Sequence, residues 1–543
     1  MNIVYQGSFL REGLQQLGHR VFPVSFARDR TLDEQVDAAC ADPDFVLIEL
    51  WGDTNLPTGL SESRHRLVAH CIDSPLNEYW ISELGKVFDD LFVDQLSSVA
   101  ALAREGLRAV WLPVCVSESA FRQPARKEHA IAFVGRFSPE RVKRLNIVTA
   151  LRRRYPVCVT EGVSAAGMAD IFARSRIVLN ENLFSGLTLR VLQGMASGSP
   201  VLTEANAAGV DDFFRDGIHL VAYTPSTLLE KAGQLLADDD ASQAIASAGQ
   251  EACRAGHTSR RRAEELLAAL AANAARNARR DQPVRRLAEA RAFARLCQRY
   301  GGLLSPARRT ARNLLQDGGN VAGEAACLLG DMEAWRGRAE EAIRLYFLAL
   351  RQGHVFPAAL KLALLFLQAG DTRRARRLLD TGRPALAENV ETAGNEADSR
   401  PEALLLHMAE TCFARGRVFY PGWLKPLGDP VPETALEVAL MAWKRGPSAR
   451  ILDMLLRCAD ACALEGQMLP YLLEAVRRGF ATDAHIVRTA QAAERLYNQD
   501  LARSVLDAFR KQGRARRQQA LADRLFRQSD PAHGQRAGQE KTP

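Results

Sequence analysis

Apolar runs and polar loops alternate most clearly between residues 176 and 204. The apolar run Ile177–Leu179 predicts a buried strand, and Thr188 is expected to cap a helix that runs through Gly194. A second short strand is predicted at Val201–Leu202. This is the order of elements in a parallel sheet. The loop before such a helix directs N–H groups and partial positive charge to the carboxyl edge of the sheet, so a phosphate-bearing ligand is expected there.

Residues 1–125 show the same order of elements. A strand is predicted at Ile3–Tyr5, a loop with Gly7 follows, and a second strand is predicted at Arg20–Val24. This is a Rossmann-type opening, in which a glycine lets the backbone approach a ligand, although a lone glycine is more often plain turn chemistry. Further strands are predicted at Phe45–Leu50, Leu67–Ile72, Asp90–Val93 and Ala109–Leu112.

Residues 126–268 predict a second α/β domain. It begins with the apolar strand Ala130–Val134, and its final helix is expected to end near Leu267. The remaining strands are predicted at Val157–Thr160, Ile177–Leu179, Val201–Leu202 and Leu220–Ala222. Two consecutive doubly wound domains imply a cleft in which a transferase holds one substrate on each wall.

The second half of the chain is predicted to be helical. Residues 269–285 are expected to form a linker or an extension of the preceding helix, 286–528 a helical domain and 529–543 a disordered tail. Within the helical domain, Gly337–Ala342 is echoed 33 residues later by Gly370–Ala375. This period resembles that of tetratricopeptide repeats, whose stacked helix pairs form a concave peptide-binding surface.

Charge and composition narrow the classes of partner. The net charge is +7, and the positive excess lies after residue 270, where 43 Lys and Arg face 30 Asp and Glu. A basic repeat surface suits an acidic partner or an anionic membrane face, and solvated Arg-rich helices explain it about as well. Neither a signal peptide nor an apolar run of about 18 residues is present, so a cytoplasmic location is expected. The ten scattered cysteines are expected to be reduced thiols.

Candidate anion-binding residues open the second domain. Gly135 and Arg136 follow its first strand, and Arg141 lies five residues after Arg136. Two arginines around a strand-end glycine suit a diphosphate, because each guanidinium makes paired charge-assisted bonds. The alternative is a pair of surface arginines at a helix start.

Three motifs carry a resemblance to a known family. Residues 190–203 read Arg-Val-Leu-Gln-Gly-Met-Ala-Ser-Gly-Ser-Pro-Val-Leu-Thr, residues 257–262 read His-Thr-Ser-Arg-Arg-Arg, and residues 70–73 read His-Cys-Ile-Asp. Together with Gly135, Arg136 and Arg141, they resemble the signatures of GT-B glycosyltransferases of the group-1 clan, and most of all its CgeB-like branch. The resemblance covers residues 1–268 and implies two Rossmann-like domains.

The resemblance also implies a set of donor-binding residues. A nucleotide-sugar donor would lie against the second domain, with its diphosphate near Gly186, Thr188 and Arg190. The family usually has a carboxylate at the position of Gln193, where it holds the ribose, and a glutamate at the position of Ser185. Both glutamates are replaced here, which puts activity and retaining stereochemistry in question; Glu181 is near enough to substitute in space.

The catalytic candidates lie in the first domain. Asp73 is the candidate acceptor-side base, with a helix cap as its alternative. His70 is a weaker candidate, because a histidine in a buried strand is more often a core residue. Glu161 is expected near the nucleobase, although a plain turn is equally suitable, and Gly7 is included among the donor-binding residues. No Asp-x-Asp motif lies at a strand end, so metal-independent transfer without a cofactor is expected, with arginines neutralising the leaving diphosphate.

These features predict an α/β protein of two Rossmann-like domains (GT-B) followed by an all-α repeat domain. The predicted activity is transfer of a sugar from a nucleotide-diphosphate donor to a hydroxyl of a protein or a cell-envelope glycan, with the repeats recruiting the acceptor. The alternative is a non-catalytic scaffold with a degenerate glycosyltransferase module. Nucleic acid is not expected as a partner, because the basic half lacks interleaved aromatic residues; peripheral membrane contact is compatible with its charge.

Overall fold

The computed structural model describes residues 1–52, 54–123, 125–138, 141–184, 186–273, 281–300, 303–381, 400–419 and 431–511. These residues divide into two compact units. The first comprises the described residues of Met1–Phe137, Ala150–Leu404 and Phe419–Glu433. The second comprises those of Ser138–Thr149, Leu405–Val418 and Thr434–Pro543.

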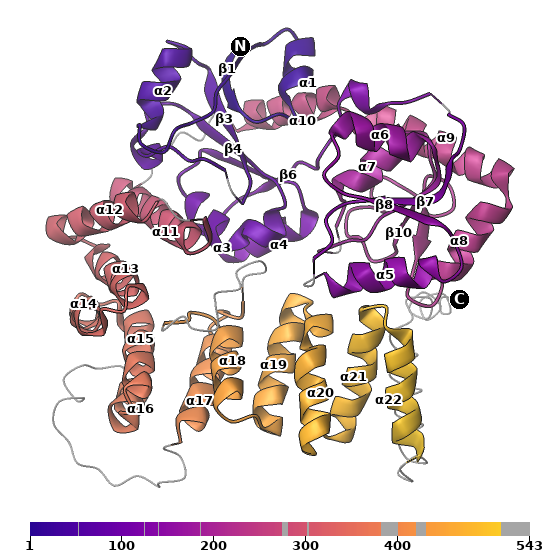
Figure 1. Ribbon diagram of the computed structural model, residues 1–543. Coiled ribbons are helices and arrows are strands. Elements are labelled where there is room, and N and C mark those ends of the chain that lie inside the picture. Colours follow the sequence, from indigo (N-terminus) through magenta and orange to yellow (C-terminus); the bar gives the residue numbers. More distant parts are fainter. Residues whose placement is uncertain are drawn as a thin grey trace, which may run out of the picture. The chain divides into compact units, whose positions relative to one another are not determined.

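The first sheet has six parallel strands in the order β2-β1-β3-β4-β5-β6 (Figure 1). Its strands are β1 Asn2–Gln6, β2 Arg20–Pro23, β3 Phe45–Leu50, β4 Leu67–Cys71, β5 Asp90–Val93 and β6 Val110–Trp111. Every residue of β3, β4 and β5 is buried, as expected for central strands of a sheet covered on both faces. The connecting helices are α1 Arg11–Gln16, α2 Leu32–Ala39, η1 Leu60–Glu62, α3 Ser74–Leu84, α4 Leu96–Arg104 and η2 Glu118–Ala120.

The second sheet has five parallel strands in the order β11-β10-β9-β7-β8. Its strands are β7 His129–Val134, β8 Val157–Thr160, β9 Ser175–Leu179, β10 Val201–Glu204 and β11 Val221–Tyr223. The helices of this part of the chain are α5 Val142–Arg152, α6 Ala165–Ala173, α7 Leu189–Ala196, α8 Leu228–Ala237, α9 Asp239–Gly256 and α10 Ser259–Ala272. The predicted fold class of two parallel α/β sheets followed by helices is therefore confirmed.

Helix α10 lies against the first sheet although it follows the second in sequence (Figure 1). Ala263, Leu266 and Leu270 share one apolar cluster with Ile3 and Tyr5 of β1. The two helices α1 and α10 come so close that a Cβ on Gly13 would lie 2.2 Å from the carbonyl oxygen of Ser259. The boundary predicted at residue 268 stays a prediction, but the core of the first domain includes residues that follow the second sheet.

Helices α11 to α16 also belong to the first unit. They are α11 Gln282–Tyr300, α12 Leu304–Asp317, α13 Ala322–Trp335, α14 Ala339–Arg351, α15 Val355–Gln368 and α16 Thr372–Thr381. Apolar residues of α11 to α13 are continuous with the core of the first sheet. The carboxylate of Glu289 on α11 accepts hydrogen bonds from the N–H groups of Gly59 at 3.0 Å and Ser61 at 2.9 Å, so it caps η1. Helix α11 begins inside the predicted linker.

Helices α13 to α16 form two successive helical hairpins with the predicted period of 33 residues. Both α15 and α16 begin 33 residues after their counterparts α13 and α14. Gly337 and Gly370 occupy the corresponding turns with φ of 74° and 83°, a left-handed conformation that a residue with a Cβ adopts at a cost. Whether these hairpins are tetratricopeptide repeats stays a prediction.

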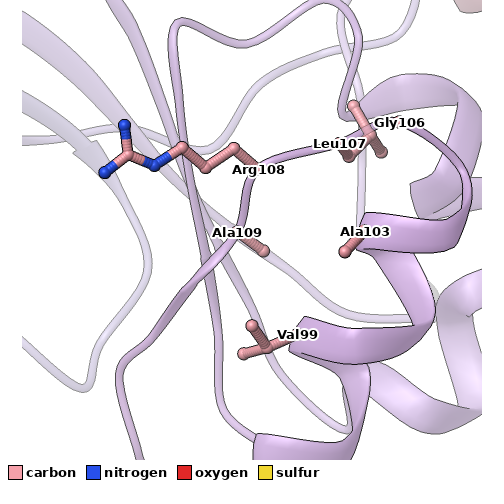
Figure 2. Close-up of a pocket in the computed structure, with 6 residues that line it drawn as sticks. All are labelled: Val99, Ala103, Gly106, Leu107, Arg108 and Ala109. Atoms are coloured by element: carbon pink, nitrogen blue, oxygen red, sulfur yellow. The ribbon is translucent and has the colours of Figure 1, made fainter.

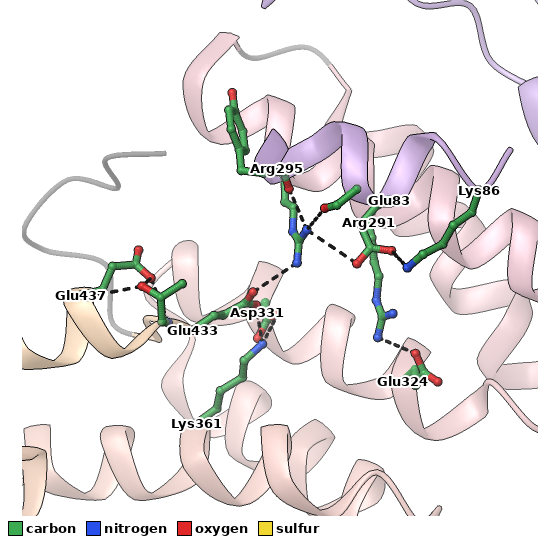
Figure 3. A network of polar contacts seen from close by, with 12 residues as sticks. Glu83, Lys86, Arg291, Arg295, Glu324, Asp331, Lys361, Glu433 and Glu437 are labelled. Atoms are coloured by element: carbon green, nitrogen blue, oxygen red, sulfur yellow. Dashed lines mark hydrogen bonds and ion pairs between the residues drawn. The ribbon is translucent and has the colours of Figure 1, made fainter. Parts of the chain in front are cut away.

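A group of buried charges joins α3 of the first domain to α11, α13 and α15 (Figure 3). The Lys361 ammonium lies 2.6 Å from Asp331 and 2.8 Å from Glu433. Arg295 lies 3.5 Å from Glu433 and 3.6 Å from Glu83. Burial raises the pKa of Glu83, but the charges of Arg291, Arg295 and Lys86 outweigh it and lower the pKa to about 2. These contacts fix the helical segment to the α/β core.

The second unit contains most of the remaining helices. They are α17 Pro401–Ala414, α18 Ala435–Arg445, α19 Ala449–Cys462, η5 Glu465–Met468, α20 Leu469–Arg478, α21 Asp483–Arg495 and α22 Gln499–Lys511. Thr434 and Thr482 begin α18 and α21 through capping boxes. The predicted tail 529–543 lies outside the described residues. No helix in the described part of the chain combines the length and the apolar character needed to cross a membrane.

Candidate functional site

Buried polar side chains gather at the carboxyl edge of the second sheet, where the sequence predicts a phosphate-binding loop. Asn180, directly after β9, is fully buried at their centre. Its Oδ1 accepts hydrogen bonds from Thr188 Oγ1 at 2.9 Å and from Arg190 Nη1 at 3.0 Å. Its Nδ2 donates to Asn182 Oδ1 at 2.6 Å and to Thr203 Oγ1 at 2.9 Å. Asn180 therefore holds the start of α7 against the ends of β9 and β10.

Arg190 connects this group to the first strand of the domain. Its Nε donates to the carbonyl oxygen of Val134 at 3.0 Å, and its guanidinium lies 4.5 Å from the centre of the Phe133 ring. A Cβ on Gly135 would lie 2.7 Å from Arg190 Nη2, so the absence of a side chain at Gly135 lets the guanidinium reach the end of β7. These contacts orient the guanidinium at the end of β7, beside the start of α7, where an anion would be bound.

Two acidic residues accompany the cluster. Glu181 and Glu204 are 3% and 5% exposed, and Glu204 Oε2 accepts a hydrogen bond from the N–H of Asn182 at 2.7 Å. Glu204 therefore fixes the chain after β9. These carboxylates place negative charge at the same edge of the sheet as Arg190.

The other predicted residues of this segment are placed as follows. Thr188 is the N-cap residue of α7, as predicted, but its hydroxyl donates to Asn180 and makes no hydrogen bond to the backbone of the helix. Gln193 is half-buried on α7. Gly186 lies before α7 in close contact with Gln95 of the first domain. Ser185 lies outside the described residues.

The loops after β7 and β8 hold the remaining second-domain candidates. Glu161 is exposed and accepts a hydrogen bond from the N–H of Phe137 at 3.2 Å, so it supports the loop that follows Arg136. Arg136 is exposed in that loop. Arg141 belongs to the second unit, where its N–H donates to the carbonyl oxygen of Ser138 at 2.9 Å. The roles of these residues stay predictions.

In the first domain, a buried carboxylate already occupies the Gly7 loop. Glu49 near the end of β3 accepts hydrogen bonds from the N–H groups of Ser8 at 2.8 Å and Phe9 at 2.9 Å, and from the hydroxyl of Tyr5. Burial raises the pKa of Glu49 despite these donors. Because the N–H groups of Ser8 and Phe9 already donate to Glu49, the loop has fewer hydrogen-bond donors for a ligand phosphate than its glycine suggests. The donor-binding role predicted for Gly7 stays untested.

Asp73 lies exposed between β4 and α3 in a left-handed conformation, with φ 50° and ψ 42°. Its carboxylate does not cap α3. Instead the buried carboxylate of Asp94, after β5, accepts hydrogen bonds from the N–H groups of Asp73 and Ser74, both at 2.9 Å. A non-glycine residue in this conformation is strained, and such strain clusters at functional sites.

His70 has the environment of a core residue. It is fully buried in β4, and its Nε2 lies 3.0 Å from the carbonyl oxygen of Leu112. Burial lowers its pKa to about 4, so the ring is neutral at physiological pH. The ring of His70 has no exposed surface that a substrate could contact.

The motif at 257–262 connects the two domains. The backbone around Thr258 pairs with Val116, at the end of the first domain. The N–H of Val116 donates to His257 O and the N–H of Ser259 donates to Val116 O, both at 3.0 Å. Arg262, 1% exposed, lies 2.7 Å from His257 Nδ1 and donates to Pro113 O at 3.1 Å. Burial and the nearby guanidinium lower the pKa of His257 to about 3. The contacts of His257 and Arg262 are those of a structural clasp.

A surface hollow of about 350 Å³ lies elsewhere, between α4 and the start of β6 (Figure 2). Its lining is mainly apolar and is made by Val99, Ala103, Gly106, Leu107, Arg108 and Ala109. It lies at the end of α4 that leads into β6, away from the carboxyl edge of the sheet. Among the described residues, no three His, Cys, Asp or Glu side chains are grouped as metal ligands would be. Metal independence stays a prediction.

Sequence reasoning missed Asn180, Asp94, Gln95 and Glu49. A signal was present for the first three, because Asn180 and Asp94 follow an apolar strand directly, as Glu161 follows β8, and Gln95 follows Asp94. The signal is weak, since turns also place polar residues at strand ends. Glu49 lies within an apolar strand, where nothing local indicates a ligand for the loop after β1.

The two parallel sheets define a protein with two Rossmann-like α/β domains. Residues 120–268, which span the second sheet, match the family described as glycosyl transferase-like. No curated protein sequence matches the chain.

Three solved structures are similar to part of this chain at low sequence identity. Anabaena HepE in complex with UDP and glucose is 13% identical, with a TM-score of 0.36 over 50% of this chain and 99% of that one. Sucrose-phosphate synthase from Thermosynechococcus elongatus is 12% identical, with a TM-score of 0.39 over 50% and 98%. An α-glucosyltransferase in complex with UDP and a DNA 13-mer is 10% identical, with a TM-score of 0.39 over 50% and 99%.

Proposed function

We propose that this protein is a glycosyltransferase that moves a sugar from a nucleotide-diphosphate donor to a hydroxyl acceptor. The family match over residues 120–268 carries the proposal. It is supported by Arg190, which is held at the start of α7 by neutral oxygens of Asn180 and Val134. A guanidinium beside a helix N-terminus stabilises a diphosphate, both bound and as a leaving group.

The roles follow from the chemistry of each position. Arg190 and the start of α7 bind the diphosphate, with Arg136 as a further cation, and Gln193 contacts the ribose through its amide. Asp73 deprotonates the acceptor hydroxyl if the reaction inverts. The helical hairpins recruit a protein or glycan acceptor. Neither a metal nor a cofactor is assigned a role, and a cytoplasmic location is proposed.

Donor binding is tested by thermal shift with a panel of nucleotide sugars. A donor at about 100 times its dissociation constant should raise the Tm by about 5 °C. Arg190→Gln should abolish this rise. Arg122→Gln is the matched control, because Arg122 pairs at 2.8 Å with Asp170 on α6 and is assigned no role in donor binding, so this variant should keep the rise.

A second variant separates loss of binding from loss of folding. Gln193→Glu restores the carboxylate usual in the family and should increase donor affinity several-fold, because charge-assisted hydrogen bonds are about twice as strong as neutral ones. The proposal is refuted if no nucleotide sugar shifts the Tm of the wild type and none is hydrolysed or transferred.

The rival function is a non-catalytic scaffold. It is favoured by the neutral amide at Gln193 and by the internal use of the Ser8 and Phe9 N–H groups by Glu49. A scaffold should keep its partner when Arg190 is replaced by Gln, whereas an enzyme should lose its donor.

A further inference from the structure

The turn from β4 to α3 is held by one buried carboxylate. Asp94 is 1% exposed, and its Oδ1 accepts hydrogen bonds from Ser74 N at 2.9 Å and Ser74 Oγ at 2.7 Å. Its Oδ2 accepts from Asp73 N at 2.9 Å and from Gln95 Nε2 at 3.1 Å. The left-handed backbone of Asp73 is therefore fixed by a residue from the next strand of the sheet.

Gln95 carries the contact into the second domain. It is 3% exposed, and its Nε2 also donates to the carbonyl oxygen of Leu187 at 2.9 Å. Its Oε1 lies so close to Gly186 that a Cβ there would be 2.0 Å away. A buried path thus runs from Asp73 through Asp94 and Gln95 to the loop before α7.

We propose that Asp94 and Gln95 are positioning residues that set the acceptor-side turn at Asp73 in register with the donor loop from Gly186 to Arg190. The proposal rests on the proposed function, since it joins the residues assigned to the two substrates. Glycosyl transfer requires the acceptor hydroxyl and the donor carbon to be aligned, and a misplacement of about 1 Å can slow such a step about 100-fold. The Gln95 amide donates to Asp94 on the acceptor side and to Leu187 on the donor side, so one side chain fixes the distance between the two.

Other contacts keep the domains together when this path is cut. The rings of Trp111 and Phe213 lie 5.2 Å apart, and the clasp at 257–262 pairs with Val116. Removal of the Gln95 amide should therefore leave a folded protein with a mispositioned donor loop.

The main test variant is Gln95→Met, which keeps the length of the side chain and removes its donor. Its matched control is Ser98→Ala on α4, which removes a buried hydrogen bond of 2.7 Å to Glu78 within the first domain. With the nucleotide sugar that the thermal-shift panel selects, Gln95→Met should lower kcat about tenfold while the donor Kd changes less than about twofold. Ser98→Ala should leave both unchanged.

A second variant tests the same contact from the other domain. Gly186→Ala introduces a Cβ against Gln95 Oε1 and should also lower kcat. Because both substitutions break one contact, the double variant should be no slower than the slower single one. Additive losses would show that the two residues act independently and would overturn the proposal.

Hydrogen exchange gives a readout that needs no activity. The backbone N–H groups of Asp73, Ser74 and Leu76 and of residues 186–190 should exchange faster together in Gln95→Met than in the wild type, and should keep wild-type rates in Ser98→Ala. Unchanged exchange at 186–190, or a lowered Tm with wild-type kcat, overturns the proposal. A wild type that binds no nucleotide sugar refutes the proposed function, whereas the exchange comparison still decides whether Gln95 couples the two loops.

Discussion

Lys361 offers the sharpest test of the buried charges that connect the helical segment to the α/β core. Its ammonium lies between Asp331 at 2.6 Å and Glu433 at 2.8 Å, and its side chain is 4% exposed. Burial lowers the pKa of Lys361, but the two carboxylates outweigh it and raise the pKa above its usual value. Lys361→Met removes the cation and leaves Asp331 buried without this ion pair, while Glu433 keeps Arg295 at 3.5 Å.

The expected loss of stability is about 4 kcal/mol, because breaking a buried pair leaves an uncompensated charge. The unfolding transition that includes α13 and α15 should therefore lose about 10 °C in Tm. Differential scanning calorimetry at about pH 7 and about pH 5 measures it. The difference in Tm between the wild type and the variant should narrow at the lower pH, because Asp331, whose pKa burial already raises, takes up a proton more readily once the lysine is gone.

Lys127→Met is the matched control. The Lys127 ammonium donates to the carbonyl oxygen of Ala173 and to Ser199 Oγ, both at 2.9 Å, so its known partners are neutral. Its loss should cost about 1 kcal/mol and show no such narrowing at acid pH. The reasoning is refuted if the two variants are equally destabilised, or if adding Asp331→Asn and Glu433→Gln to Lys361→Met restores no stability.

Three further predictions use the same unfolding assays. Glu83→Gln should lower the free energy of unfolding by about 3 kcal/mol at about pH 7. The lowered pKa of Glu83 stabilises the wild type above about pH 4.5, and this stabilisation is lost as the pH falls towards 2. A difference in stability between wild type and variant that stays constant down to about pH 3 would contradict this prediction. Gly13→Ala should destabilise strongly because its Cβ meets Ser259 O at 2.2 Å, while Gly256→Ala, with nothing within 4 Å, should be neutral. Equal effects of the two alanines would refute that close approach. Glu49→Gln should lower the free energy of unfolding by about 2 kcal/mol, because the new amide nitrogen would face a backbone N–H. Gln16→Glu, at an exposed position, is the control and should leave the stability unchanged.

The sequence predicted the two sheets because buried parallel strands are short apolar runs that alternate with helices. It also predicted the period of the helical hairpins, since Gly337 and Gly370 occupy equivalent turns. It did not predict that Glu49 fills the Gly7 loop, because that contact joins residues 40 positions apart.

The candidate site was predicted in part for the same reason. Arg190 and the N-cap position of Thr188 were identified, but Asn180, which accepts hydrogen bonds from both side chains, was not. Hydrogen-bond partners of buried polar groups depend on which strand ends become neighbours, and a single sequence does not specify the strand order. The hydrogen bonds of Asp94 and Gln95 depend on the contact between the two domains, because Gln95 donates to a residue 92 positions away, and no local sequence pattern predicts such a contact.

The position of α10 against the first sheet has a consequence for how the chain folds during synthesis. A ribosome that adds about 5 to 20 residues per second finishes the strands of the first sheet roughly 10 to 30 s before it finishes α10. During this interval the apolar side chains of Ile3, Tyr5 and Leu14 lack Ala263, Leu266 and Leu270, their partners in the native core. A fragment that stops at residue 125 leaves the same surface uncovered, so the nascent first domain depends on the second for its last layer.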